Sequence, residues 1–380
     1  MNTTVLAPLS IPSPPLDWAS FSIPFGSWLH GLIPAIPASQ ELTVRAYAIA
    51  ILIGIVAAVV LTQRRLTARG VQPGIVLDIA IWAVPFGIIG ARIYHVLTHT
   101  GDYFGEGMDI RHVFFIWEGG LAIFGGLIGG LIGSIIACRM LGLRLTAWAD
   151  ALAPGLILAQ AFGRLGNYFN HELFGQPTDL PWGLEIEATN PAYPVGLPEG
   201  VLFHPTFLYE ILWNLLGVAV ILYAERRWSL QKKTILGLSL PVPIGGTVSL
   251  QWGRLIGVYL IWYGLGRTVW ESIRIDPSDI LFGIRTNVWA ALFAIALGIA
   301  IVIVQGRRHP GAEPSPYLPG REWVPVVDSE ETYSDDDAHG TVDSKKAATV
   351  NSKKTTQSDE LVPATSGAGK PATSGKGKKS

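Results

Sequence analysis

The chain has 380 residues, of which 49% are hydrophobic and only 15% are charged, against roughly 25% in an average soluble protein. Residues 306–380 hold 22 of its 57 charged side chains (28 basic and 29 acidic in all), which leaves 35 for the first 305 residues. This composition excludes an ordinary soluble fold and a collagen-like chain, and a net charge of −1 gives no basic excess for nucleic acid. A single cysteine, Cys138, excludes a disulfide-stapled chain.

Residues 1–43 are predicted to be an extracytoplasmic leader. Positions 21–37 mix Phe, Trp28, Leu and Ile with Ser, His30 and three prolines, and they lack the basic start of a cleavable signal peptide. Because amphipathic pieces with Trp and Phe favour the membrane interface, we expect a short element on the outer membrane surface. An irregular leader is the alternative.

Seven apolar runs have membrane-spanning length: about 44–62, 75–97, 113–137, 147–163, 206–223, 254–273 and 287–304. The fourth contains Asp150, Pro154 and Gly155, so a broken or half-buried helix is as consistent with it as a clean span. We therefore expect an all-α polytopic protein whose seven-span membrane domain covers residues 44–305.

Basic residues in the loops indicate the orientation, because Lys and Arg collect on the cytoplasmic side. They follow the first, third, fifth and seventh runs, for example at Arg64, Arg139, Arg226 and Arg307. Residues 165–205 have none and carry five acidic residues. This alternation predicts an N-terminus outside and a cytoplasmic C-terminus, and six or eight spans would break it.

After Gln305 the composition changes to Pro, Ser, Thr, Gly and charged residues, with a lysine-rich end from Lys345. Such a stretch buries too little apolar surface to offset its ordering entropy. Residues 306–380 are therefore predicted to be a disordered cytoplasmic tail with no catalytic part.

Glycines recur every fourth residue in the third run. Gly125, Gly129 and Gly133 form one stripe, and Gly126 and Gly130 form a second. Small residues at this spacing let helix backbones touch, so tight packing is the first interpretation. A glycine-lined lipid cleft is the second.

Eleven ionisable residues are expected at membrane depth, where each costs about 2.5–3.5 kcal/mol at a helix centre. They are Arg45, Asp78, Arg92, Glu118, Asp150, Arg164, Glu210, Arg254, Arg267, Glu271 and Arg274. For any one of them a structural ion pair is a sufficient explanation. As a set they indicate pairing around an internal polar cavity.

Two short segments concentrate these polar groups. GRLGNYFNHELFG, residues 163–175, places an arginine, two asparagines and a glutamate at the outer end of the fourth run. In YGLGRTVWESIR, Arg267, Glu271 and Arg274 share a helix face, and an Arg267–Glu271 pair is the plain explanation. Two arginine clusters facing one cavity would instead suit a lipid phosphate, whose oxygens match a forked guanidinium.

The first of these segments resembles the signature of the bacterial prolipoprotein diacylglyceryl transferases. Further matches are VRAYA with Tyr47, WEGGLAIFGGLIGG from Trp117, and HPTFLYE, in which Glu210 lies just inside the membrane. Asp150 ahead of the signature and Asp276 after Arg274 also match. The resemblance runs from about residue 44 to residue 304, and it implies seven spans with an outside N-terminus.

The resemblance implies transfer of the diacylglyceryl group from phosphatidylglycerol to the lipobox cysteine thiol of a prelipoprotein, in the bilayer of the bacterial cell membrane. A thioether forms and glycerol phosphate leaves. It implies no cofactor, and no His, Cys and carboxylate set has metal-ligand spacing. Carried over by position, the catalytic candidates are Arg164, Arg267 and Glu210, and the further substrate-binding candidates are Asn167, Asn170, Glu172, Tyr47, Asp150, Glu271 and Arg274.

One position departs from the family pattern. Many members have a histidine, a candidate base, where this chain has Phe124, and phenylalanine cannot take a proton. The alternatives are another base, for which His171 and His204 are candidates, or a position that never served as one. Each of these histidines is also explained as an interface residue.

The chemistry gives the arginines a role. A thiol is mostly protonated at neutral pH, and negative charge grows on the departing phosphate, so fixed guanidinium groups would assist both thiolate formation and departure. We expect Arg164 to hold the phosphate and Arg267 to stabilise the leaving group, with Glu210 and Glu271 orienting them. A transporter or channel for an anionic solute or lipid, and a non-catalytic membrane scaffold, are the competing interpretations.

Overall fold

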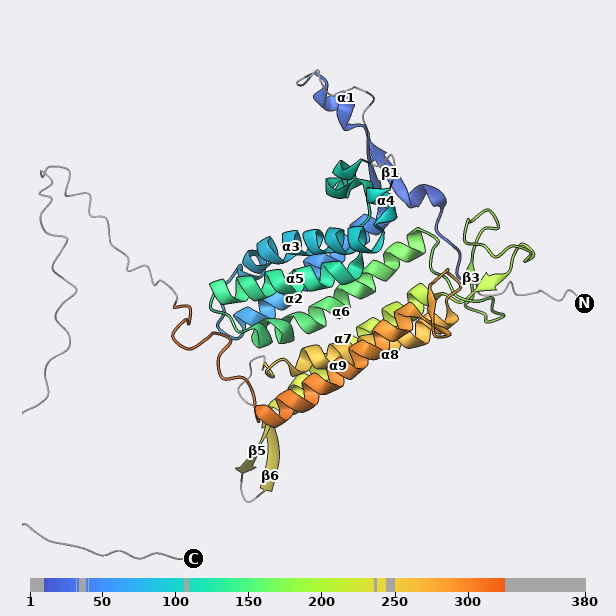
Figure 1. The fold of residues 1–380 in the computed structure, drawn as a ribbon. Coiled ribbons are helices and arrows are strands. Elements are labelled where there is room, and N and C mark those ends of the chain that lie inside the picture. Colours follow the sequence, from blue (N-terminus) through green and yellow to red (C-terminus); the bar gives the residue numbers. More distant parts are fainter. Residues whose placement is uncertain are drawn as a thin grey trace, which may run out of the picture. The chain divides into compact units, whose positions relative to one another are not determined.

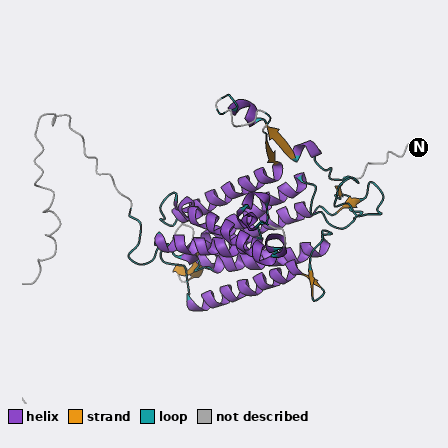
Figure 2. Ribbon diagram, turned by 45° about the horizontal axis from the view of Figure 1, so that its top comes forward, coloured by secondary structure: helices purple, strands orange, loops and turns teal. Residues whose placement is uncertain are grey.

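The structure is a computed structural model that describes residues 10–31, 33, 39, 41–105, 109–235, 238–243 and 250–324. The side chain of Glu118 and residues 325–380 lie outside this described part. Long helices lie side by side in one bundle, and short strands and loops gather at its ends (Figures 1 and 2).

Within the described residues, six helices are long and apolar enough to cross a membrane: α2 (Ala46–Thr67), α3 (Ile75–Thr98), α5 (Ile123–Met140), α6 (Leu145–Phe169), α7 (Thr206–Ser229) and α9 (Thr286–Arg308). A further helix, α8 (Arg254–Ile273), is long enough, but Arg254, Arg267 and Glu271 make it more polar, and it is not one of the six. The chain is thus mostly helical, as expected, with six candidate spans.

Short elements decorate the bundle. The helical ones are η1 (Leu16–Trp18), α1 (Phe25–Leu29), α4 (Gly101–Phe104), η2 (Ile110–Phe114) and η3 (Ile116–Glu118). Four antiparallel hairpins join β1 (Ser20–Ile23) to β2 (Leu42–Arg45), β3 (Leu184–Glu185) to β4 (Leu202–Phe203), β5 (Leu230–Ile235) to β6 (Leu238–Pro243), and β7 (Ile280–Leu281) to β8 (Ile284–Arg285). The described part of the leader region therefore contains a strand pair, the 3₁₀ turn η1 and the short helix α1.

The glycines of α5 pack against α3. An added Cβ would lie 2.2 Å from the Gly90 carbonyl oxygen at Gly125, 2.1 Å from that of Phe86 at Gly129 and 2.5 Å from that of Trp82 at Gly133. Real Cβ atoms do not approach so closely, so the two helix backbones touch along this stripe. Tight packing, the first interpretation of these glycines, is confirmed.

The third predicted span begins later than expected. Residues 110–118 form the 3₁₀ turns η2 and η3, and α5 begins only at Ile123. Two features end the helical pattern: Gly119 and Gly120 have positive φ angles of 95° and 70°, and this loop wraps the Arg92 guanidinium. Arg92 donates to the carbonyls of Val113 at 2.8 Å and Gly119 at 2.7 Å, so the loop backbone satisfies a buried charge instead of continuing a helix.

Helix α6 runs unbroken through Pro154 and is the most buried of the six candidate spans. Half of its apolar window is buried, against 17–33% for the others. The broken-helix alternative is therefore wrong, and the half-buried one is confirmed. Its central position brings α6 into contact with α2, α7 and α8, which is where polar residues from several helices can meet.

A buried polar cluster ties these helices together at the end of the bundle where α6 begins. Arg65 of α2 forms a 2.8 Å ion pair with Glu225 of α7 and donates to the carbonyls of Ala151 and Asp150, both at 3.2 Å. The fully buried Asp150 carboxylate accepts hydrogen bonds from the backbone N–H groups of residues 251, 253, 255 and 256, at the start of α8. Asp150 thus caps α8 by satisfying its first backbone donors.

The chain after Gln305 does not leave the bundle at once. Helix α9 continues to Arg308, and residues 309–324 fold back over the same end. Glu313 and Tyr317 are buried, Thr146 donates to Glu313 at 2.7 Å, and Arg144 N–H donates to the Pro316 carbonyl at 2.8 Å. The predicted tail begins at residue 306. In the structure, residues 309–324 pack on the bundle through a few buried side chains, which the average composition of the whole tail does not reveal.

Candidate active site

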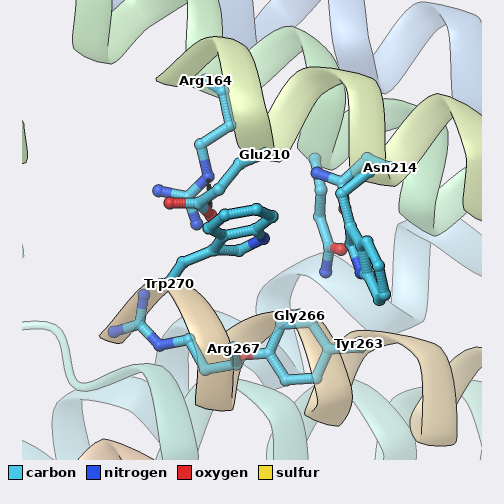
Figure 3. A pocket seen from close by; sticks show the side chains of 9 residues that line it. Arg164, Glu210, Asn214, Tyr263, Gly266, Arg267 and Trp270 are labelled. Atoms are coloured by element: carbon cyan, nitrogen blue, oxygen red, sulfur yellow. Dashed lines mark ion pairs between the residues drawn. The ribbon is translucent and has the colours of Figure 1, made fainter. Parts of the chain in front are cut away.

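A polar cavity lies where α6, α7 and α8 converge. The empty space there is about 260 Å³ when the open solvent at its mouth is included. Its lining residues are Gln160, Arg164, Glu210, Trp213, Asn214, Tyr263, Gly266, Arg267 and Trp270. Figure 3 shows the Arg164 and Arg267 side chains on opposite sides of the Trp270 indole. The three residues predicted as catalytic, Arg164, Arg267 and Glu210, therefore share one cavity.

Arg164 and Glu210 join α6 to α7. The Arg164 Nε lies 2.8 Å from the Glu210 Oε2, and Arg164 Nη1 donates to the Asn167 Oδ1 at 3.1 Å. Pro205 precedes α7 and fits its first turn, which places the buried Glu210 one turn inside the helix. The Arg164 Nη2 has no protein partner among the described residues and remains available to a ligand.

The signature segment ends α6 and turns the chain back toward it. His171 and Leu173 take positive φ angles of 51° and 59°, and the Glu172 N–H donates to the Asn167 carbonyl at 3.1 Å. The Glu172 carboxylate then accepts from Asn167 Nδ2 at 2.8 Å and Asn170 Nδ2 at 3.4 Å. The predicted residues of this segment thus form a hydrogen-bonded chain that holds Arg164.

On the other side of the cavity, Arg267 belongs to a network that joins α8 to the start of α9. The fully buried Glu271 carboxylate lies 2.9 Å from Arg267 Nη2 and 3.0 Å from Arg285 Nε, and it accepts from Asn287 Nδ2 at 2.9 Å. The predicted intrahelical pair is therefore present. Glu271 is shared between Arg267 and Arg285, so two positive charges face one negative charge. The network therefore keeps a net positive charge beside the cavity.

Arg274 lies beyond the end of α8 and does not line the cavity. Its guanidinium binds the Asp276 carboxylate, with Nε 2.6 Å from Oδ1, and its carbonyl accepts from Arg285. Burial alone would raise the pKa of the Asp276 carboxyl, but hydrogen bonds and charge from Arg274, with Arg285, hold that pKa below its ordinary value. Arg274 is thus a neighbour of the cavity that braces the turn into α9.

Two other predicted residues lie apart from the cavity lining. Tyr47, near the start of α2, packs so closely on Gly166 that an added Cβ would meet its ring at 2.4 Å, beside Asn167. Asp150 caps α8 and lies 14 residues before Arg164 on one continuous helix, a separation of roughly 20 Å. The position of Asp150 does not support substrate contact, because its carboxylate already accepts four backbone hydrogen bonds elsewhere.

None of the three positions considered for a catalytic base, Phe124, His171 and His204, lines the cavity. Phe124 contacts Tyr94, with 6.2 Å between ring centroids. His171 is buried, with Nε2 2.7 Å from the Pro14 carbonyl and Nδ1 3.4 Å from Glu187. His204 is 3.2 Å from the Tyr209 hydroxyl. Both histidines therefore have structural partners: those of His171 lie in the N-terminal segment and in the loop between α6 and α7, and that of His204 lies in the first turn of α7.

Sequence reasoning missed several residues of the cavity and of the network behind it. Gln160, Trp213, Asn214, Tyr263 and Trp270 line the cavity, and Arg285 and Asn287 hold Glu271. A usable signal was present for three of these: Gln160, Asn214 and Tyr263 each lie four residues from a predicted catalytic residue, and therefore on the same helix face.

The cavity lining has a net positive charge, with two arginines and one glutamate, and it faces a bundle with extensive apolar surface. It can therefore bind an anion attached to a lipid. Hydrogen bonds from the remaining guanidinium nitrogens would be charge-assisted and oriented, since both arginines are already held by carboxylates.

Comparisons with known proteins identify the family of this chain. Residues 34–304 match the family described as "Prolipoprotein diacylglyceryl transferase". The phosphatidylglycerol--prolipoprotein diacylglyceryl transferase of Leifsonia xyli is 52% identical over 347 residues, which cover 89% of this chain and 94% of the relative. Phosphatidylglycerol--prolipoprotein diacylglyceryl transferase 2 of Streptomyces coelicolor is 42% identical over 269 residues, covering 71% of this chain and 78% of the relative. The chain therefore belongs to the prolipoprotein diacylglyceryl transferase family.

Proposed function

We propose that this chain transfers the diacylglyceryl group of phosphatidylglycerol to the lipobox cysteine of prelipoproteins, the first step of lipoprotein maturation. The observation that carries this proposal is the pair Arg164 and Arg267, brought from two helices to one cavity within an apolar bundle. The family match and the names of its relatives give the reaction.

The reaction joins the cysteine sulfur to the glycerol carbon that carries the phosphate. As the carbon–sulfur bond forms, the bond from that carbon to the phosphate oxygen breaks, and glycerol phosphate leaves with the electron pair. The thiol gives up its proton, so that atoms and charge balance. Negative charge therefore moves from the sulfur to the departing phosphate, and a cationic cavity stabilises both ends of this movement.

The arginines take separate roles in this scheme. Arg164 holds the phosphate of the bound lipid, and Arg267 stabilises the charge that grows on the leaving group. Loss of one comparable preorganised donor costs about 2.7–4 kcal/mol in other enzymes. Glu210 and Glu271 fix the two guanidinium groups, at 2.8 Å and 2.9 Å respectively, so the arginines need no reorganisation during the reaction.

The remaining predicted positions support these arginines. Asn167, Asn170 and Glu172 form the hydrogen-bonded chain behind Arg164, and Tyr47 packs beside it. Arg274 braces the turn that presents Arg285 to Glu271. We assign these residues to positioning of the cavity in the substrate complex.

A seven-span topology in the bacterial cell membrane completes the proposal, with the N-terminus outside and the C-terminus in the cytoplasm. The six candidate spans support it together with α8, whose polar residues face the cavity and Glu271 network. Basic residues at the ends of α2, α5, α7 and α9 support the orientation. Lipid and signal peptide would both reach the cavity from the bilayer.

A transporter and a scaffold are the competing functions, and one assay separates them from a transferase. Purified full-length protein is mixed with vesicles containing phosphatidylglycerol and a peptide that carries a lipobox cysteine. A transferase adds the mass of a diacylglyceryl group to the peptide through a thioether and releases glycerol phosphate. Lipid movement without any peptide modification would count against the proposal, and a Cys→Ser peptide is the control.

A further inference from the structure

The cavity has two layers with different chemistry. Each of the three helices contributes one charged residue and, four residues nearer the Arg65–Glu225 pair, one neutral hydrogen-bonding residue. The three couples are Arg164 with Gln160, Glu210 with Asn214, and Arg267 with Tyr263. Four residues advance an α-helix by about 6 Å, so the neutral layer lies one turn deeper than the charged layer.

Asn214 is the unexplained member of the neutral layer. Its residue surface is only 7% exposed, yet among the described residues its side-chain amide has no hydrogen-bond partner. Among the described residues, the fully buried side-chain atoms that lack a partner do not include the Asn214 amide, so the small accessible surface of this residue opens into the cavity. Because Asn214 lines the cavity, a bound molecule that offers both a donor and an acceptor would supply the missing partners.

Gln160 has a fixed orientation in the same layer. Its Nε2 donates to the Tyr259 hydroxyl at 2.8 Å, which leaves its carbonyl oxygen without a donor among the described residues. Asn214 and Gln160 together therefore offer amide donors and acceptors but no charge. The one carboxylate of the lining, Glu210, is held by Arg164 in the other layer, so a cationic group in the neutral layer would lack a counter-ion.

We propose that Asn214, assisted by Gln160, forms a subsite for the free hydroxyl groups of the lipid headgroup alcohol. This inference rests on the proposed function and adds to it the basis of headgroup selection. With the phosphate between Arg164 and Arg267, a three-carbon alcohol reaches about one helical turn, which matches the depth of the neutral layer. The subsite accepts a neutral diol and disfavours both an alkyl headgroup and an ammonium headgroup.

The layering also fits the product. The glycerol phosphate that leaves carries its charge at one end and its hydroxyl groups at the other, and the cavity presents the charged and neutral layers in that order. A lipid that lacks the hydroxyl groups would leave Asn214 unpaired, and sites built to bond a hydroxyl group reject analogues without one.

The test compares two donor lipids that differ only in the headgroup alcohol: phosphatidylglycerol, and phosphatidylpropanol, whose three-carbon headgroup carries no hydroxyl group. Initial rates of thioether formation on the lipobox peptide give the donor ratio for each variant. We expect the wild type to prefer phosphatidylglycerol by about ten- to a hundredfold, from one or two lost hydrogen bonds. Asn214→Leu should reduce this ratio to near one by slowing phosphatidylglycerol alone.

Two further variants make the outcome decisive. Thr268→Val removes a hydroxyl group of α8 that bonds within its own helix, to the Gly264 carbonyl at 2.9 Å, and should leave the ratio unchanged. Asn214→Ser keeps one hydroxyl group and should give an intermediate ratio, which answers the question even if the leucine variant does not fold.

The results that overturn the inference are equally definite. If transfer from both donors slows by the same factor in Asn214→Leu, the donor ratio stays at its wild-type value. That result assigns Asn214 a structural role. Wild-type transfer at equal rates from both lipids overturns the subsite while the proposed function stands. A wild type that forms no thioether from phosphatidylglycerol overturns both.

Discussion

Two buried polar clusters in the described part of the bundle differ in how completely their arginine guanidinium groups are used. At the end where α6 begins, Arg65 uses all three of its guanidinium nitrogens on Glu225 and two carbonyls. Asp150 accepts four backbone hydrogen bonds there. In the cavity, Arg164 uses two nitrogens, Arg267 uses one, and Asn214 uses none of its side-chain atoms.

This difference separates stabilising charges from binding ones. We call the Arg65 cluster saturated because all three Arg65 guanidinium nitrogens have protein partners, although Glu225 Oε1 accepts no hydrogen bond. A buried charge is tolerated only when it is paired and hydrogen-bonded, so this cluster is explained by the fold itself. The cavity retains guanidinium nitrogens that form no hydrogen bond with the described residues, and these are free to bind the anionic ligand proposed above. In the sequence both clusters are simply ionisable residues in apolar helices.

Breaking the saturated cluster should have the largest effect, and that effect should be on stability. Arg65→Met leaves Glu225 buried without its counter-ion, which typically costs about 3–5 kcal/mol. The measurement is thermal unfolding of the detergent-solubilised protein. The matched control is the double variant Arg65→Met/Glu225→Leu, which should recover most of the loss because no unpaired charge remains. A double variant as unstable as the single one would contradict this account.

Breaking the unsaturated cluster should instead affect transfer. Arg164→Ala should slow thioether formation by about 100- to 1,000-fold, as expected for loss of a preorganised donor, while the protein still inserts in the membrane. The exposed Arg226 near the end of α7 provides the control, since Arg226→Ala should leave the rate unchanged. Near-normal transfer by Arg164→Ala would remove the phosphate-holding role from this residue.

The smallest expected effect concerns Glu313, which docks the 309–324 segment beside the saturated cluster. Burial raises the pKa of its carboxyl to about 7, assisted by the charge of Asp150 and opposed by Thr146, Arg144 and Arg69. The folded-state pKa therefore exceeds the unfolded one. The stabilisation is fully present below about pH 4.5 and is lost as the pH rises to about 7.

The measurement is the difference in Tm between the wild type and Glu313→Gln, taken from pH 5 to pH 8. The glutamine variant cannot ionise, so the wild type should lose Tm relative to it as the pH rises across this range. A constant difference would show that Glu313 does not titrate in the folded protein.

Much of the fold could be predicted from composition, because a membrane span is specified by its own residues. The run predicted at 254–273 coincides with α8, and the others fall within a few residues of helices except the third. That exception depends on a tertiary contact, since the 110–118 loop is held by Arg92, which lies in another helix. Similarly, the order in residues 309–324 depends on a few side chains that meet distant partners.

The site was predictable only where its contacts are local. The Arg267–Glu271 pair follows from a spacing of four residues on one helix. The contacts of Arg285 with Glu271 and of Arg164 with Glu210 require knowledge of which helices are neighbours. Asp150 illustrates the same limit, because no pattern within α6 shows that its carboxylate meets the start of α8 instead of the cavity.

The close contact between α3 and α5 has a consequence for lipid traffic. Where the backbones at Gly90 and Gly129 touch, no gap remains between the two helices that could admit an acyl chain. Gly257 and Gly298 close the seam between α8 and α9 in the same way, with an added Cβ 2.5–2.9 Å from a facing carbonyl oxygen. A lipid that enters or leaves the cavity through the wall of the bundle must therefore pass between other helices, and each of these two pairs forms one closed section of that wall.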